Sequence, residues 1–126
     1  MHLQIGFTLV ELIVIIVILG VLGVVAIPQF ANLDKEASQA SVDGIAGALN
    51  SASALNYAAC RSKSPECQLK LKSCEGFSKD PVLSDGLDTD YSITPKTLGS
   101  TAGDTVICTL THKPSGLTAT FTGITP

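Results

Sequence analysis

The sequence has few aromatic residues and little charge. It holds four Phe, two Tyr and no Trp, and 15% of its residues are charged. An aromatic path for electron transfer would rest on Phe7, Phe30 and Tyr57, and ordinary packing explains each of them more simply. The net charge of −3 argues against a basic nucleic-acid-binding protein, so no specific nucleic-acid partner is expected. The only locally basic stretch, Arg61 to Lys72, is interpreted as a solvated surface.

Motifs of catalysis and phosphate binding are also missing. The sequence has no Gly-x-Ser-x-Gly elbow and no glycine-rich phosphate loop. His112 falls in a predicted hairpin turn, where we do not expect a Ser-His-Asp triad. Asp85, Asp88 and Asp90 could bind calcium, but their spacing does not match the twelve-residue calcium loop, and an ordinary acidic turn is the simpler interpretation. The sequence therefore predicts neither an enzyme nor a cofactor, with calcium at this turn as the open alternative.

One long apolar run dominates what the sequence does contain. Phe7 to Ile27 is 21 residues long, and Glu11 is its only charged residue. As a helix, the run would span about 31 Å, which matches the hydrocarbon core of a bilayer. A carboxylate in that setting is costly, so Glu11 is expected to have either a partner or a function.

Three interpretations of this run compete. A simple transmembrane anchor would leave Glu11 as an accident near the interface. A secretory signal peptide has an apolar region of only about 7 to 15 residues before a small-residue cleavage site, and the run here is longer and ends in a poor site. The third interpretation places the processing site before the run, between Gly6 and Phe7. Cleavage there leaves a new amine four residues ahead of Glu11.

The third arrangement resembles the type IV pilin family, which includes the pseudopilins of type II secretion. The matching residues are Gly6, Phe7-Thr8-Leu9-Val10-Glu11-Leu12, the apolar helix with Gly20, and Pro28. Within the family, Ile27-Pro28-Gln29-Phe30-Ala31-Asn32-Leu33 looks most like the type IVa-like, mannose-sensitive haemagglutinin-type major pilins. The resemblance is strong over residues 6–34 and thin beyond. One departure is that Met1 to Ile5 has no Lys or Arg, which leaders of this family usually carry.

This resemblance implies a pathway from membrane to surface. A prepilin peptidase would cleave after Gly6, Phe7 would be N-methylated, and inner-membrane assembly machinery would add the subunit to a homo-oligomeric filament outside a bacterium. The carboxylate of Glu11 would be neutralised by the amine of Phe7, in its own chain or a neighbouring one, and would set axial register. Such filaments serve adhesion and biofilm formation, with motility or DNA uptake if a retraction motor exists. A pseudopilin and a monomeric membrane-anchored binding domain remain the alternatives.

Four cysteines lie beyond the apolar run and predict two disulfides in an exported domain. A zinc site is disfavoured because no Cys-x-x-Cys is present. Ser64-Pro65-Glu66 is typical of a helix start, and a helix through Cys67 and Cys74 would hold those two about 10 Å apart. Among the three possible pairings, Cys60–Cys67 with Cys74–Cys108 is therefore preferred.

The expected fold is α+β, a disulfide-stapled pilin fold. We predict a leader at 1–6, an apolar transmembrane or filament-core helix at 7–28 and a globular domain at 29–126. One helix should run from about Phe7 to about Ala59, kinked at Pro28. A loop with one short helix follows, and then strands near 91–94, 105–111 and 117–122, the last two as a hairpin. This antiparallel sheet of three or four strands should pack on a helix stripe comprising Val42, Ile45, Leu49, Ala52 and Leu55.

Overall fold

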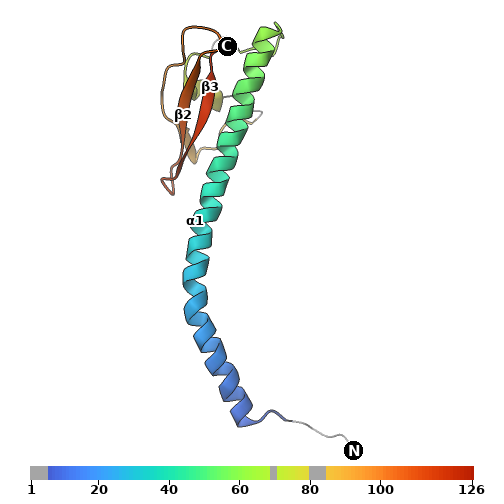
Figure 1. The fold of residues 1–126 in the computed structure, drawn as a ribbon, viewed down its shortest axis with the longest axis vertical. Coiled ribbons are helices and arrows are strands. Elements are labelled where there is room, and N and C mark those ends of the chain that lie inside the picture. The colour runs from blue at the N-terminus through green and yellow to red at the C-terminus, as the bar shows by residue number, and fades with distance from the viewer. Residues whose placement is uncertain (1–5, 69–70, 80–84) are drawn as a thin grey trace, which may run out of the picture. The chain divides into compact units, whose positions relative to one another are not determined.

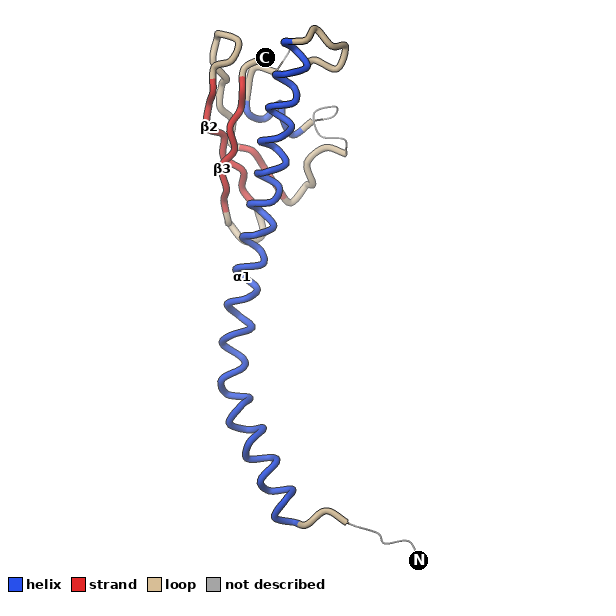
Figure 2. The backbone as a smooth tube through the Cα atoms, turned by 45° about the vertical axis from the view of Figure 1, so that its right-hand side comes forward, coloured by secondary structure: helices blue, strands red, loops and turns tan. Residues whose placement is uncertain are grey.

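The computed structural model describes residues 6–68, 71–79 and 85–126 (Figure 1). Its elements are helix α1 (Leu9–Arg61), the 3-10 helix η1 (Cys74–Ser78) and the strands β1 (Tyr91–Ile93), β2 (Thr105–His112) and β3 (Thr118–Ile124). Figure 2 colours the helices blue and the strands red. The chain divides into two units, one ending at Glu36 and the other comprising Ala37–Pro126. One long helix, a three-stranded antiparallel sheet and two disulfides confirm the predicted α+β pilin fold.

Helix α1 begins at Leu9, two residues later than predicted, because Thr8 caps it. The hydroxyl of Thr8 accepts the amide of Glu11 at 3.2 Å, and its carbonyl accepts the amide of Leu12, also at 3.2 Å. Thr8 and Glu11 have the Thr-x-x-Glu spacing of a capping box. This signal of a helix start is easily missed because it lies within the long apolar run. The helix then continues through Pro28, which lacks an amide and so removes one backbone hydrogen bond. A kink at Pro28 stays a prediction.

The other end of α1 stops in a Schellman motif. The amide of Ser64 bonds the carbonyl of Ala59 at 2.9 Å, and the amide of Lys63 bonds the carbonyl of Cys60 at 3.2 Å. Lys63 takes the left-handed position, with φ of 55°, that glycine usually fills. The end of α1 is therefore fixed by backbone hydrogen bonds without the glycine that would have marked it in the sequence.

The helix predicted to start at Ser64 is wrong for the described residues. The hydroxyl of Ser64 does accept the amide of Glu66 at 3.3 Å, but the chain forms only a turn there. The amide of Gln68 bonds the side-chain oxygen of Asn56 at 2.8 Å, and Cys67 is joined to Cys60. These two attachments to α1 hold the segment as a loop, and the short helix of this region is instead η1, beginning at Cys74.

The sheet has the order β1-β2-β3, and each neighbouring pair is antiparallel. Cys108 lies opposite Phe121, and Ile93 lies opposite Leu110. These residues form the buried face, whereas Ile107 on the other face is 54% exposed, as the alternation of the sequence predicted. The predicted hairpin of β2 and β3 is confirmed.

All buried side chains of the described residues belong to the second unit. The apolar ones are Val42, Ala46, Leu49, Cys74, Phe77, Ile93, Leu98, Cys108, Leu110 and Phe121. The predicted helix stripe is partly wrong, because Leu55 is 70% exposed while Ser53 and Asn56 are buried. The hydroxyl of Ser53 accepts the amide of Ile124 in β3 at 2.8 Å. Polar side chains therefore replace apolar ones where α1 meets the edge of the sheet.

Candidate functional site

The predicted processing site lies in an exposed segment just before α1. Gly6, Phe7 and Thr8 are outside the helix, and the Phe7 side chain is 80% exposed. A Cβ atom placed on Gly6 would meet nothing within 4 Å. The Gly6–Phe7 peptide bond is thus accessible to a protease. The peptide groups from Leu9 onward belong to the helix instead and take part in its hydrogen bonds.

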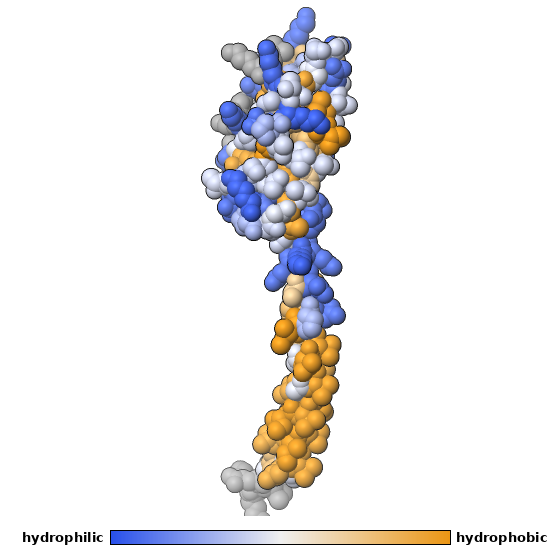
Figure 3. Space-filling model, turned by 90° about the vertical axis from the view of Figure 1, so that its left-hand side faces the viewer, coloured by the Kyte–Doolittle hydropathy of each residue, from blue (hydrophilic) through white to orange (hydrophobic). Residues whose placement is uncertain are grey.

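The first unit exposes an apolar helical surface over most of its described length. Every residue from Gly6 to Val25 is exposed, and Phe30 and Leu33 continue the apolar surface. Figure 3 shows this run as an orange surface. The helix is long and apolar enough to cross a membrane. A soluble monomer rarely exposes so much contiguous apolar surface, so lipid or other protein must cover it.

Glu11 lies in the first turn of α1, within that apolar surface. A negative charge is favoured there because the unpaired amides of a helix N-terminus carry partial positive charge. Within residues 6–68, 71–79 and 85–126, no ion pair involving Glu11 is present. Its side chain is exposed, and the predicted pairing with the amine of Phe7 stays a prediction.

The fold and the exposed helix define an α+β protein built like a pilin, and comparison with known families agrees. Residues 1–27 match the family model described as the prokaryotic N-terminal methylation motif. The first 27 residues therefore carry the type IV prepilin signal. No curated protein and no solved structure gave a significant match. The predicted subgroup, mannose-sensitive haemagglutinin-type, stays a prediction.

Both disulfides form, in the pairing that the sequence favoured. Cys60 at the end of α1 bonds Cys67 in the following loop, and Cys74 in η1 bonds Cys108 in β2. Cys74 and Cys108 are fully buried, whereas Cys60 and Cys67 are half-buried. One bond therefore fastens a surface loop to the helix, and the other passes through the core.

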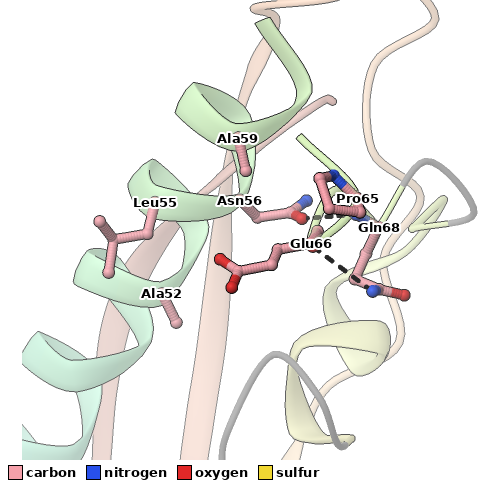
Figure 4. A pocket seen from close by; sticks show the side chains of 7 residues that line it. All are labelled: Ala52, Leu55, Asn56, Ala59, Pro65, Glu66 and Gln68. Atoms are coloured by element: carbon pink, nitrogen blue, oxygen red, sulfur yellow. Dashed lines mark hydrogen bonds between the residues drawn. The ribbon is translucent and has the colours of Figure 1, made fainter. Parts of the chain in front are cut away.

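A pocket of about 500 Å³ lies between the end of α1 and the loop after it (Figure 4). Its lining consists of Ala52, Leu55, Asn56, Ala59, Pro65, Glu66 and Gln68. The side-chain nitrogen of Asn56 is buried and has no hydrogen-bond partner among the described residues. None of the predicted site residues lines this pocket.

His112 contacts Ser115, and no motif in the sequence predicted this pair. The Nδ1 atom of His112 lies 2.6 Å from the hydroxyl of Ser115, which also accepts the amide of Leu117 at 3.3 Å. The ring of His112 packs on that of Tyr91, with 4.9 Å between centroids. Within the described residues no carboxylate contacts this ring, so the pair orders the hairpin turn and does not form a triad.

The acidic turn is organised by its own backbone. The carboxylate of Asp88 accepts the amide of Asp90 at 2.9 Å, and the carbonyl of Asp90 accepts the amide of Lys113 at 2.8 Å. The ammonium group of Lys113 bonds the carbonyl of Thr89 at 2.5 Å. Among residues 6–68, 71–79 and 85–126, no three candidate metal ligands cluster. Residues 80–84 of the same loop lie outside the described residues.

Proposed function

We propose that this chain is a structural subunit of a type IV pilus, without enzymatic activity of its own. In this proposal a prepilin peptidase cleaves after Gly6, and the exposed amine of Phe7 is methylated. Residues 7–28 hold the precursor in the inner membrane and then form the filament core, with residues 29–126 as the globular part. The filament, on the outside of a bacterium, serves adhesion and biofilm formation.

One observation carries this proposal, namely that the methylation motif of residues 1–27 includes a long apolar helix whose side chains are exposed. Prepilin processing removes the leader next to that helix, which leaves its surface to be covered by other subunits once it leaves the lipid. A monomeric anchor would need no such processing. A bend at Pro28 would let the two halves of α1 take different directions in the filament.

The second half of α1 supports burial against neighbouring subunits as well. No charged residue occurs between Asp43 and Arg61, although much of the helix surface there is exposed. A helix face that meets water normally carries charged side chains. The exposed residues are mostly small: Gly44, Gly47, Ala48, Asn50, Ser51, Ala54, Leu55 and Ala58. Small residues allow helices to approach closely, which suits the packed interior of a filament.

The second candidate is a pseudopilin, which carries the same N-terminal motif. The two disulfides favour the pilus, because pseudopilins often lack paired cysteines. Mass spectrometry of the mature N-terminus and electron microscopy of sheared surface fibres distinguish the candidates. We expect an N-methylated Phe7 and fibres that disappear when the chain is deleted. Processed protein without fibres would favour the pseudopilin, and a retained leader would contradict both.

The role of Glu11 can be tested by Glu11→Ala, with Glu36→Ala as the matched control. Both residues are exposed acids of α1, but Glu36 lies beyond the apolar surface. Losing one partner of a buried ion pair costs about 3 to 5 kcal/mol. We therefore expect Glu11→Ala to be cleaved normally and to yield few fibres, and Glu36→Ala to yield normal numbers. Equal fibre counts for the two variants would contradict the assembly role of Glu11.

A further inference from the structure

A polar recess lies between α1 and the outer edge of β3, within the second unit. Its volume is about 490 Å³, and it is lined by Asp43, Ala46, Gly47, Asn50, Thr118, Ala119 and Thr120. A Cβ atom placed on Gly47 would meet nothing within 4 Å. The missing side chain of Gly47 therefore keeps the recess open on the helix side.

The β3 side of the recess presents main-chain groups. His112 and Leu117 are a hydrogen-bonded pair of the hairpin, so alternation directs the amides and carbonyls of Thr118, Thr120 and Thr122 away from β2. Gln39 bonds the carbonyl of Thr118 at 3.2 Å, and Asn50 bonds the amide of Thr122 at 2.6 Å. Between these two attachments, no described residue bonds the main chain of Thr120.

Asp43 supplies a negative charge to the same recess. One oxygen of its carboxylate accepts the side-chain amide of Gln39 at 2.8 Å, and that same amide reaches the carbonyl of Thr118. Gln39 thereby holds the carboxylate of Asp43 beside the edge of β3. No cation pairs with Asp43 in the part of the chain that the structure describes.

We infer that this recess receives the ammonium group of a lysine side chain from a second copy of the chain. The inference rests on the proposed filament, which is what brings a second copy close. The carboxylate of Asp43 and the free carbonyl of Thr120 offer acceptors on two sides, and a negatively charged recess attracts a cation. An ammonium group has three donors around a compact charge and suits such acceptors, whereas a guanidinium fork prefers a coplanar pair.

The lining also suits the rest of a lysine side chain. The methylene stem would lie along Ala46, Gly47 and Ala119, which carry no polar side-chain atoms. Several lysines are exposed and make no side-chain hydrogen bond among the described residues: Lys35, Lys63, Lys72 and Lys79. A contact of this kind is weak at a single surface but is repeated for every subunit of a filament.

The test is carbodiimide cross-linking of assembled filaments. Filaments are grown from a mixture of ¹⁴N- and ¹⁵N-labelled subunits, cross-linked, and digested for mass spectrometry. We expect an amide bond between Asp43 and a lysine in peptide pairs of mixed label, which proves that two copies are joined. Pairs of unmixed label alone would place the lysine in the same chain and overturn the inference.

Thr120→Tyr is the decisive variant, because a large side chain on this lining residue fills the recess and leaves Asp43 in place. Thr105→Tyr is the matched control, since Thr105 is also an exposed threonine of the sheet but does not line the recess. Relative to other cross-links in the same digest, the Asp43 product should disappear in Thr120→Tyr and persist in Thr105→Tyr. Equal yields in the two variants would overturn the inference.

The two proposals fail in different ways. If electron microscopy shows filaments but no cross-link forms at Asp43, the inference about the recess is wrong and the pilus remains. If no filaments form, the proposed function is wrong, and the inference falls with it.

Discussion

Single residues set both ends of α1, and each acts through local backbone chemistry. Thr8 caps the first turn with its hydroxyl, while Lys63 ends the helix in a left-handed conformation. A side chain in that conformation brings its Cβ atom too close to the following carbonyl, which costs about 1 to 2 kcal/mol. The Schellman hydrogen bonds of Ser64 and Lys63 outweigh this cost. The end of α1 was therefore hard to predict from the sequence, because Lys63 stands at the position where glycine usually marks a helix end.

Replacing Lys63 by glycine should stabilise the protein. Glycine removes the steric cost but loses more backbone entropy on folding, so we expect a net gain of about 0.5 to 1 kcal/mol. Thermal unfolding followed by circular dichroism, on the full chain in detergent, measures it. Ser62→Gly is the matched control, because Ser62 does not have a positive φ and glycine should lower stability there. A lower melting temperature for Lys63→Gly would contradict the Schellman assignment.

At the scale of elements, periodicity predicted which segments form helix and strands but not how they meet. The alternation in β2 and β3 placed Cys108, Leu110 and Phe121 on the buried face correctly, because that face is apolar throughout. The stripe of α1 was shifted, and Leu55 was placed in the core instead of Ser53. Ser53 is buried because it bonds Ile124, 71 positions away, and such a partner leaves no periodic signal.

The hydrogen bond between Ser53 and Ile124 should contribute measurably to stability. Ser53→Ala leaves the amide of Ile124 without an acceptor at a partly buried site, which costs about 1 kcal/mol or more. Ser51→Ala is the matched control, since that exposed hydroxyl bonds only the carbonyl of Gly47 one turn earlier. Chemical unfolding and hydrogen exchange of the Ile124 amide would show the loss in the first variant alone. Similar exchange rates for the two variants would contradict it.

For the whole molecule, stability and exposure are divided between the two units. The buried side chains all belong to Ala37–Pro126, whereas the described residues of the first unit expose their apolar surface. The position of that surface and of its one charge could be predicted, because the length and hydropathy of a membrane-length run are visible in the sequence alone. The recess beside Asp43 could not, because it depends on a helix and a strand edge that are joined by hydrogen bonds between residues 79 and 72 positions apart.

The two disulfides should contribute unequally to the stability of the second unit. Cys74–Cys108 spans a sequence separation of 34 and Cys60–Cys67 one of 7. Loop-closure entropy therefore predicts losses of about 4 and about 2.5 kcal/mol when each pair is removed. The gap should widen because Cys74 and Cys108 are fully buried, so their removal also leaves a cavity.

The measurement compares urea unfolding of Cys60→Ala/Cys67→Ala with that of Cys74→Ala/Cys108→Ala, each in the full chain. We expect the first pair to unfold at moderately lower urea and the second to lose most of its cooperative transition. Both variants replace two cysteines by two alanines. A difference between their stabilities therefore comes from where each disulfide lies and not from the change in composition. If the first pair proved the more damaging, the loop after α1, and not the sheet core, would hold the second unit together.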